Sequence, residues 1–395
     1  MIYCLIITDK ERLMFKKFSR IENPNERLEI FNLLKFNISL CLRLAEFVAL
    51  AFLISGLGWF IATPLTGKLG FAAGTFISVA LMLAFIWLLR LPALLMHTNL
   101  RAAYGLDQRS GKVRFLKLLR PGLRRGLAAW LASCLLVMGL EVDLWLWTIG
   151  AALLCLILTT IDAIFPRLLQ PENWRPPKSG EIPPGLADRI KLWALKTSLQ
   201  PEQIVISTDF ISELEPPRLA GLGSRTRLVI SEKALNSFSP RELTLMVSGT
   251  AMGAMIKAPV RFLLLRLCAL AAALPLAAIL ISILGTRIWG YPLVINPALI
   301  TLVWLALWLG SLLANLAINL TRRNLDTQLM AMAAIILKDD QAVETALAVL
   351  ADKNLEEPTP SIWREFFLPR HTQKNFLKKI RYHQHLSKFN ESGET

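Results

Sequence analysis

Residues 239–257 read SPRELTLMVSGTAMGAMIK, and this stretch predicts a helix with a well-defined start. Ser239 is a favourable N-cap, and Pro240 suits the first helical position because its missing N–H would have no intrahelical partner there. Glu242, at the third position, completes a capping box with Ser239. We expect the helix to run from this start to Ala258-Pro259.

The middle of this helix is rich in small residues. Gly249 and Gly253 lie four residues apart, a spacing that lets another helix approach closely. The composition therefore predicts that a neighbouring helix packs against this face. Nucleophilic chemistry at Ser248 or Thr250 is the weaker interpretation, because a hydroxyl needs an adjacent base and only Lys257 is nearby in the sequence.

Most of the remaining chain is apolar enough for a membrane. Of its 395 residues, 54% are hydrophobic, and the mean hydropathy is +0.47. A membrane-crossing helix needs about 20 mostly apolar residues. Six stretches come near or exceed that length, which predicts a polytopic α-helical membrane protein with about six transmembrane helices: 40–63, 70–96, 126–141, 144–165, 262–285 and 294–318.

The distribution of charge predicts the topology. The net charge is +15, and the segment 98–125 carries eight Lys and Arg residues against a single acid, Asp107. Because basic connections stay on the cytoplasmic side, we expect both termini and all large connections to be cytoplasmic, in an inner or plasma membrane. A nucleic-acid role is disfavoured, because no basic patch with stacking aromatic residues is evident. The partner that composition implies is the lipid bilayer.

The chain divides into membrane and cytoplasmic parts. Alternating apolar runs at 203–207 and 227–231 predict short strands, and residues 186–197 have the spacing of an amphipathic helix. The cytoplasmic part is therefore expected to be a small α+β domain. The expected order is a basic tail (1–38), four spans with the basic loop 98–125 (39–165), the α+β domain (166–259), two spans (260–318) and a helical tail (319–395).

Arg43, Arg90 and Glu46 are among the ionisable residues that fall inside or near the ends of the predicted spans. Arg43 and Arg90 lie near span ends, where a long side chain can reach the membrane surface. Glu46 is harder to accommodate, because a carboxylate inside a span is costly and usually faces a partner or a wet cavity. We expect Glu46 either to face such a chamber or to lie near the cytoplasmic interface.

The order of these elements resembles that of the type-I CAAX prenyl endopeptidases and related membrane zinc metallopeptidases. The resemblance covers about residues 90–335 and rests on the order of several short motifs rather than on any one of them. It implies a peptidase-like cytoplasmic domain completed by the tail. The motifs are Leu91-Pro92 with Tyr104-Gly105-Leu106, Ile164-Phe165-Pro166, Gly221-Leu222-Gly223 with Arg227-Leu228-Val229-Ile230 and Glu242, and the run from Thr321 to Gln328.

The chemistry that this resemblance implies is missing. The family binds zinc with an H-E-x-x-H helix and a later glutamate. Counting from Glu242, these positions fall at Gly249, Thr250, Gly253 and Leu325. None of these side chains can ligate zinc or act as the general base, and no histidine occurs between His97 and His371. We therefore expect no metal and no cofactor.

The resemblance also implies a substrate-binding edge ahead of the glycine-rich turn. The corresponding stretch, 213–217, contains Pro216-Pro217, and proline donates no backbone hydrogen bond to an added strand. His371 loosely matches a C-terminal family motif that holds substrate, but the proline that should follow it is absent. A solvated histidine is the simpler interpretation of His371, which stays a weak substrate-binding candidate.

Three functions remain open on the sequence. The favoured one is a pseudopeptidase that keeps the scaffold and binds or regulates a membrane protein or lipid partner. The second is an active metalloendopeptidase with ligands recruited from elsewhere in the chain. The third is a membrane chamber protein that binds lipids or peptides without cleaving them.

Overall fold

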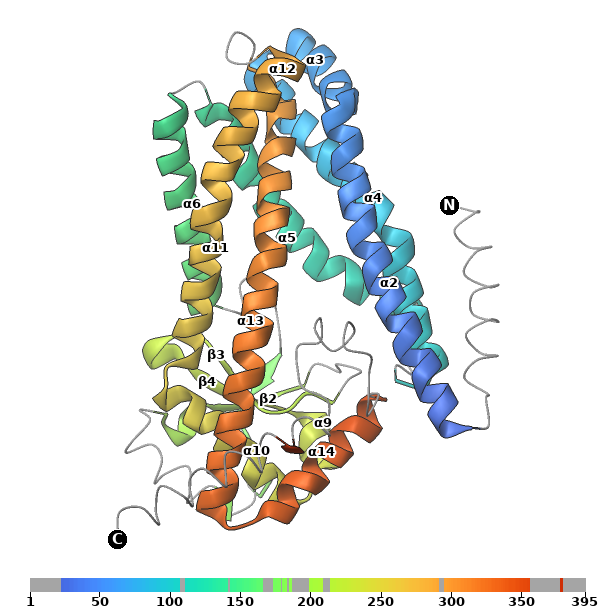
Figure 1. Cartoon of the computed structure of the whole chain (residues 1–395), viewed down its shortest axis with the longest axis vertical. Helices are drawn as coiled ribbons and strands as arrows, with labels where there is room; N and C mark the ends of the chain where they lie inside the picture. The colour runs from blue at the N-terminus through green and yellow to red at the C-terminus, as the bar shows by residue number, and fades with distance from the viewer. Residues whose placement is uncertain are drawn as a thin grey trace. The chain divides into compact units, whose positions relative to one another are not determined.

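The structure, a computed structural model, consists of two compact units, each built from two separate parts of the chain (Figure 1). Unit 1 comprises residues 1–160 and 266–315, and unit 2 comprises residues 161–265 and 316–395. The residues that the structure describes are 23–106, 111–140, 143–165, 173–178, 180–182, 185–186, 199–208, 214–290, 295–355 and 377–378.

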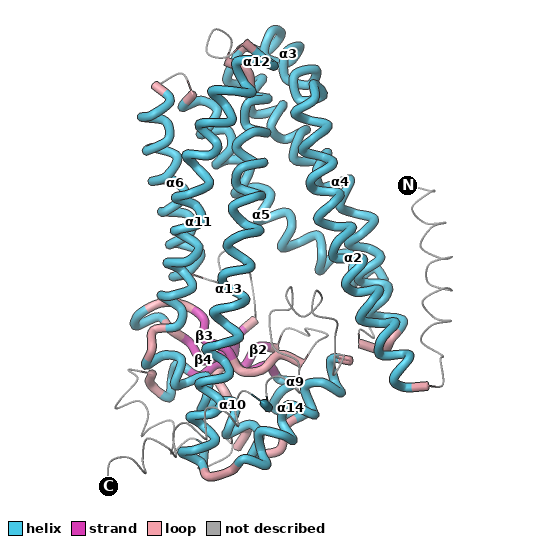
Figure 2. Tube along the Cα trace, in the orientation of Figure 1, coloured by secondary structure: helices cyan, strands magenta, loops and turns pink. Residues whose placement is uncertain are grey.

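The regular secondary structure in the described part of unit 1 is helical, as Figure 2 shows. Three of its helices, α6, α11 and α13, also contribute residues to unit 2. Two short π-helical turns, Leu53–Leu57 and Ile281–Gly285, join consecutive helices. The helices are α2 (Pro24–Phe52), α3 (Gly58–Leu69), α4 (Phe71–Ala103), α5 (Gly111–Gly139), α6 (Leu144–Ile164), α11 (Ala258–Leu280), α12 (Thr286–Trp289) and α13 (Ile300–Leu337), with a 3₁₀ turn at Pro297–Leu299.

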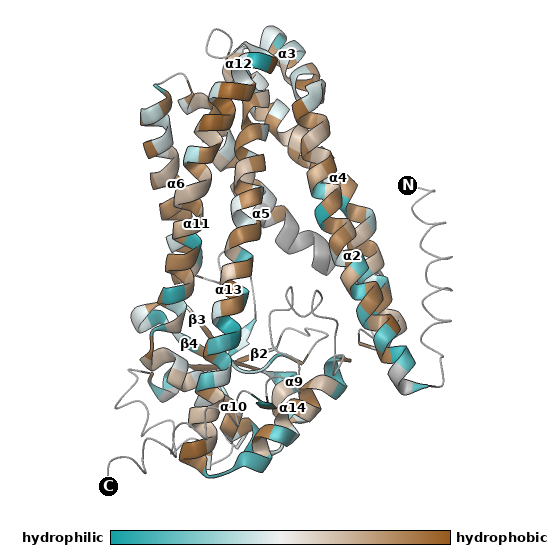
Figure 3. Ribbon diagram, in the orientation of Figure 1, coloured by the Kyte–Doolittle hydropathy of each residue, from teal (hydrophilic) through white to brown (hydrophobic). Residues whose placement is uncertain are grey.

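Five helical segments are long and apolar enough to cross a membrane, and they correspond to five of the six predicted spans. The sixth, predicted at 126–141, is a shorter apolar helix, Gly126–Gly139, at the end of α5. Figure 3 shows the apolar residues along these helices. The chain is thus a polytopic α-helical integral membrane protein. The five segments are Glu26–Leu69, Phe71–Ala103, Leu144–Ile164, Ala258–Trp289 and Pro297–Leu337.

The membrane helices extend into segments that we expected to be a tail and a loop. Helix α2 begins at Pro24, inside the predicted tail 1–38, and most of the predicted loop 98–125 belongs to α4 and α5. The physical reason is that Lys and Arg are good helix formers, so a basic stretch next to a span continues the helix.

The motif Tyr104-Gly105-Leu106 ends α4. Gly105 has a positive φ of 75°, its N–H donates to the carbonyl of Ala102, and the N–H of Leu106 donates to that of Arg101. These two hydrogen bonds form a Schellman motif, which satisfies the last carbonyls of the helix. The motif that carried part of the family resemblance is therefore a helix stop.

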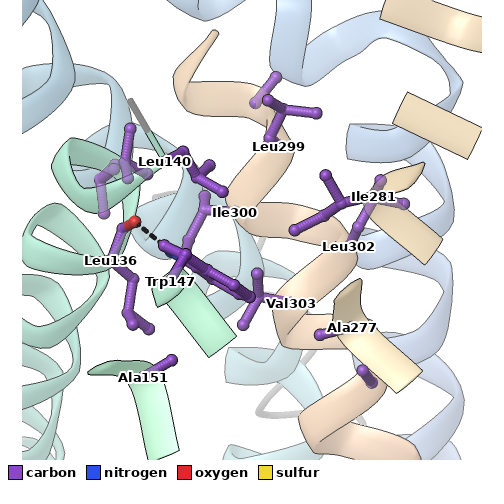
Figure 4. Packing of buried hydrophobic residues seen from close by; sticks show 14 of the residues in the cluster. Leu136, Leu140, Trp147, Ala151, Ala277, Ile281, Leu299, Ile300, Leu302 and Val303 are labelled. Atoms are coloured by element: carbon purple, nitrogen blue, oxygen red, sulfur yellow. Dashed lines mark hydrogen bonds between the residues drawn. The ribbon is translucent and has the colours of Figure 1, made fainter. Parts of the chain in front are cut away.

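The core of unit 1 is held by apolar packing and by tryptophan hydrogen bonds. The indole of Trp147 donates to the carbonyl of Leu136 at 2.8 Å, which ties α6 to α5 (Figure 4). Trp130 donates to the carbonyl of Phe76 at 2.8 Å and thereby ties α5 to α4. Buried tryptophans combine a large apolar surface with one polar group that must find a partner.

Unit 2 is built around a four-stranded sheet with the order β1-β2-β4-β3. The predicted strands at 203–207 and 227–231 are confirmed as the parallel central pair, with Ile204 opposite Leu228. The two edge strands are antiparallel to their neighbours. The strands are β1 (Trp174–Arg175), β2 (Ile204–Ser207), β3 (Arg218–Ala220) and β4 (Arg227–Ser231).

Helices cover this sheet and complete an α+β domain. A buried apolar cluster joins the central strands to α10 and α14 through Leu228, Ile230, Val247 and Ala346. The predicted amphipathic helix 186–197 lies almost wholly outside the described residues, although Leu186 is buried in this cluster. The helices of unit 2 are the last residues of α6, α9 (Glu232–Ser237), α10 (Pro240–Met255), the N-terminal part of α11, the C-terminal part of α13, and α14 (Asp340–Asn354), with 3₁₀ turns at Pro201–Gln203 and Gly223–Arg225.

Candidate functional site: the small-residue helix Pro240–Met255

Helix α10 begins as its sequence predicts. The N–H of Ser239 donates to Oε2 of Glu242 at 2.8 Å, and the N–H of Glu242 donates to the Ser239 hydroxyl at 3.4 Å. The helix ends at Met255 rather than at Ala258-Pro259, because Lys257 adopts a left-handed conformation with φ of 52°. That break separates α10 from α11.

Gly249 lies directly against the part of α13 that belongs to unit 2. A Cβ added to Gly249 would lie 3.0 Å from Sδ of Met330 and 3.6 Å from the carbonyl oxygen of Leu329. A contact of 3.0 Å is tighter than ordinary van der Waals packing. The predicted close approach of another helix to this face is therefore confirmed, and the neighbour is α13.

Gly253 continues the same contact one turn later. Its added Cβ would lie 3.4 Å from Cδ1 of Leu329 and 3.4 Å from Cδ1 of Leu219 in β3. Apolar side chains thus close around both glycines. Leu245 and Met252 of α10 join Leu329 in one buried cluster along this interface.

The hydroxyl groups on α10 are engaged with backbone carbonyls. Thr250 Oγ1 lies 2.9 Å from the carbonyl of Met246 and 3.0 Å from that of Pro217. The Ser248 hydroxyl donates to the carbonyl of Thr244, and Ser248 is fully buried. A hydroxyl that gives its proton to a carbonyl has no base to activate it, so these contacts disfavour the nucleophilic interpretation.

Leu325 is buried on α13, one turn before Leu329. The four positions where the resemblance places zinc ligands and the general base thus carry two glycines, a hydrogen-bonded threonine and a buried leucine. No three His, Cys, Asp or Glu side chains within the described parts of the chain lie close enough together to hold a metal ion. The residues present at this site do not fit zinc.

The stretch before β3, where the resemblance places substrate, is hydrogen-bonded to the protein's own side chains. The N–H of Leu214 donates to Oδ1 of Asn354 at 2.6 Å, and Nδ2 of Asn354 donates to the carbonyl of Leu214 at 2.9 Å. The Ser231 hydroxyl donates to the carbonyl of Glu215 at 3.3 Å. The amide of Asn354 therefore pairs with this backbone as a neighbouring strand would.

Two prolines follow Glu215 and further reduce the hydrogen-bonding capacity of residues 214–217. Pro216 and Pro217 have no N–H to donate, and the carbonyl of Pro217 accepts the Thr250 hydroxyl. Residues 214–217 form no strand; the edge strand β3 begins only at Arg218. Glu213 lies outside the described residues. Sequence reasoning found the prolines but missed Asn354, which is 140 residues away and carries no local signal.

Electrostatics in unit 2 centre on one ion pair beside the sheet. Both terminal nitrogens of Arg175 lie 2.6 Å from the two carboxylate oxygens of Glu181, and Glu232 lies 3.4 Å from the same guanidinium. The hydrogen bonds from Arg175, with a further one from the Lys178 N–H, lower the pKa of Glu181 to about 2. This ion pair links β1 to Glu181 and to Glu232 at the start of α9.

His371, the weak substrate-binding candidate, lies outside the described residues, as do His383 and His385.

Comparison with known proteins gives a fold and no close relative. No family model matches the sequence, and no curated protein matches it either. Among solved structures, the crystal structure of S. mikatae Ste24p is similar, with a TM-score of 0.68 and 15% sequence identity. The similarity covers 96% of this chain and 97% of Ste24p. At this identity it shows that the two chains share a fold over nearly their whole length.

Proposed function

We propose that this protein is an integral membrane pseudopeptidase of the CAAX prenyl endopeptidase type, which keeps the fold as a scaffold or regulator and does not hydrolyse peptides. The observation that carries the proposal is the contact between Gly249 and Met330. The space that a metal-binding side chain at Gly249 would need is filled by the Met330 thioether, so loss of the ligand is matched by packing.

The substrate edge gives independent support. Strand addition needs free backbone donors and acceptors along an exposed edge. Here Asn354 pairs with the N–H and the carbonyl of Leu214, Ser231 and Thr250 donate to the carbonyls of Glu215 and Pro217, and the two prolines lack donors. A peptide substrate would have to displace a buried, doubly hydrogen-bonded asparagine. Binding of substrate and binding of metal are thus disfavoured by separate features.

The role left for such a scaffold is to bind a partner in or at the bilayer. Its membrane helices keep large exposed apolar surfaces, including Phe60, Leu88, Trp145 and Leu313. These surfaces suit contact with lipid or with another membrane protein. The alternative, an active metalloendopeptidase, would need ligands recruited from elsewhere in the chain, because the positions that the resemblance assigns carry none.

The direct test is the zinc content and the peptidase activity of the purified full-length protein. We expect substoichiometric zinc by elemental mass spectrometry and no chelator-sensitive cleavage of a prenylated CAAX peptide. The matched control replaces His371, His383 and His385 with glutamine, which separates tail-bound zinc from a site in the fold. One zinc per chain that survives this replacement, together with chelator-sensitive cleavage, would overturn the proposal.

A further inference from the structure

Glu46 is a buried carboxylate that three side chains of unit 1 contact. Its Oε1 lies 3.1 Å from Nη2 of Arg90 on α4, and its Oε2 lies 3.3 Å from Nη1 of Arg43 on α2. The indole N–H of Trp308 on α13 donates to the same Oε2 at 2.8 Å. The two arginines therefore turn to Glu46, rather than only extending toward the membrane surface as the sequence suggested.

The cluster carries an unbalanced charge. Two guanidinium groups face one carboxylate, which leaves a net charge of one positive unit. Glu46 is the only acidic residue in the described segments 30–106, 111–140, 266–290 and 295–315, and the preceding acids of α2, Glu26 and Glu29, lie roughly 25 Å or more before it along the helix axis. Each arginine uses one terminal nitrogen in its contact with Glu46, and a guanidinium has five N–H donors.

The arginines are accessible and lie among exposed apolar side chains. The side chain of Arg43 is 44% exposed and that of Arg90 is 34% exposed. Leu40 and Phe47, which share the face of Arg43 at helical spacing, are also exposed on a helix of membrane length. An uncompensated cation in such surroundings is costly, which favours an anion that itself comes with acyl chains.

The position along the helix suits the headgroup level of a bilayer. Lys35 lies eight residues before Arg43, roughly 12 Å along the helix axis. Lys35 and Arg43 thus place two basic residues on the part of α2 that precedes Glu46. Basic residues near the end of a membrane helix attract anionic lipid headgroups.

We propose that Arg43 and Arg90 form a binding site for the phosphate group of an anionic membrane lipid. The phosphate oxygens would accept hydrogen bonds from both guanidinium groups, a geometry that arginine favours. Glu46 and Trp308 are positioning residues: they hold the arginines together without touching the phosphate. The acyl chains would lie along Leu40 and Phe47.

The test is native mass spectrometry of the full-length protein in detergent, with an equimolar mixture of phosphatidylglycerol and phosphatidylcholine. We expect more phosphatidylglycerol than phosphatidylcholine adducts on the wild type. The variant R43Q/R90Q should lose the preference, by about fivefold for each basic residue removed. Arg287→Gln, an exposed arginine at the far end of a span, is the matched control and should keep the preference.

A second variant has the opposite sign and guards against simple misfolding. Glu46→Gln keeps an acceptor for Trp308 but removes the competing carboxylate, so we expect phosphatidylglycerol adducts to increase by about fivefold. An unchanged preference in R43Q/R90Q, or an equal loss in Arg287→Gln, would overturn the proposal. If inorganic phosphate binds and neither lipid is preferred, or if a peptide co-purifies in place of lipid, then the ligand is not an anionic lipid.

Discussion

The side chain of Asn354 forms two hydrogen bonds with the backbone of Leu214, at 2.6 Å from the N–H and at 2.9 Å to the carbonyl. Both residues are buried. Asn354, the last residue of α14, therefore saturates the backbone N–H and carbonyl of Leu214, just before the edge strand β3. A single side chain thus forms the pair of hydrogen bonds that a neighbouring strand could form with this residue.

Replacing Asn354 with alanine should leave the N–H and the carbonyl of Leu214 buried without partners. Each such loss costs about 1–3 kcal/mol, so we expect a clear fall in the free energy of unfolding. Thermal unfolding in detergent measures it. The adjacent exposed Lys353→Ala is the control and should change stability by less than about 0.5 kcal/mol. Equal stability of the two variants would contradict the structural role of Asn354.

Gly249→Ala should be less stable than a Gly→Ala change in an open helix, because the new methyl group lies 3.0 Å from Sδ of Met330 and an overpacking cost of about 1–3 kcal/mol opposes a helix-propensity gain of about 1 kcal/mol. Gly150→Ala is the matched control: it lies in a helix with no atom within 4 Å of an added Cβ. There the change should be neutral or stabilising by up to about 1 kcal/mol. Chemical or thermal unfolding of both variants distinguishes packing from helix propensity.

Restoring the four family residues should not restore a zinc site. We expect the variant G249H/T250E/G253H/L325E to stay substoichiometric in zinc, because an imidazole at the first position collides with Met330. Adding Met330→Ala removes that obstacle and should raise the zinc content. Elemental mass spectrometry checks both. Stoichiometric zinc in the four-residue variant alone would show that Met330 does not close the site.

The ion pair of Arg175 with Glu181 predicts a pH dependence. The pKa of Glu181 falls from its ordinary value of 4.5 to about 2 on folding, so the pair stabilises the protein above about pH 4.5. That contribution is lost as the pH falls through about 2. The unfolding temperature is measured between pH 5 and pH 2. The decrease caused by losing this ion pair should appear in the wild type and be absent from Glu181→Gln. The control Glu202→Gln, which replaces an exposed carboxylate, should show the same decrease as the wild type.

Local patterns explain why part of the fold could be predicted. The strands β2 and β4 follow from short runs of branched apolar residues, and the start of α10 follows from Ser239, Pro240 and Glu242. The spans follow from length and hydropathy alone. Where prediction missed, as in the basic segment 98–125, the charge pattern indicated exposure but did not distinguish a loop from an exposed helix.

The pairings that define both sites could not be predicted in this way. Arg90 meets Glu46 and Met330 meets Gly249 across separate helices, and Asn354 meets Leu214 across 140 residues. Sequence periodicity does not predict which side chains from distant parts of the chain come into contact, because these contacts depend on how the packed helices and strands are placed in space.

The sequence by itself determined that Gly249, Thr250, Gly253 and Leu325 offer no metal ligand, since ligand chemistry belongs to each side chain alone. Only the tertiary structure decided what lies there instead. Met330 and Leu329 pack against the two glycines, and Thr250 bonds to Pro217, because close packing leaves no empty volume beside a helix of small residues.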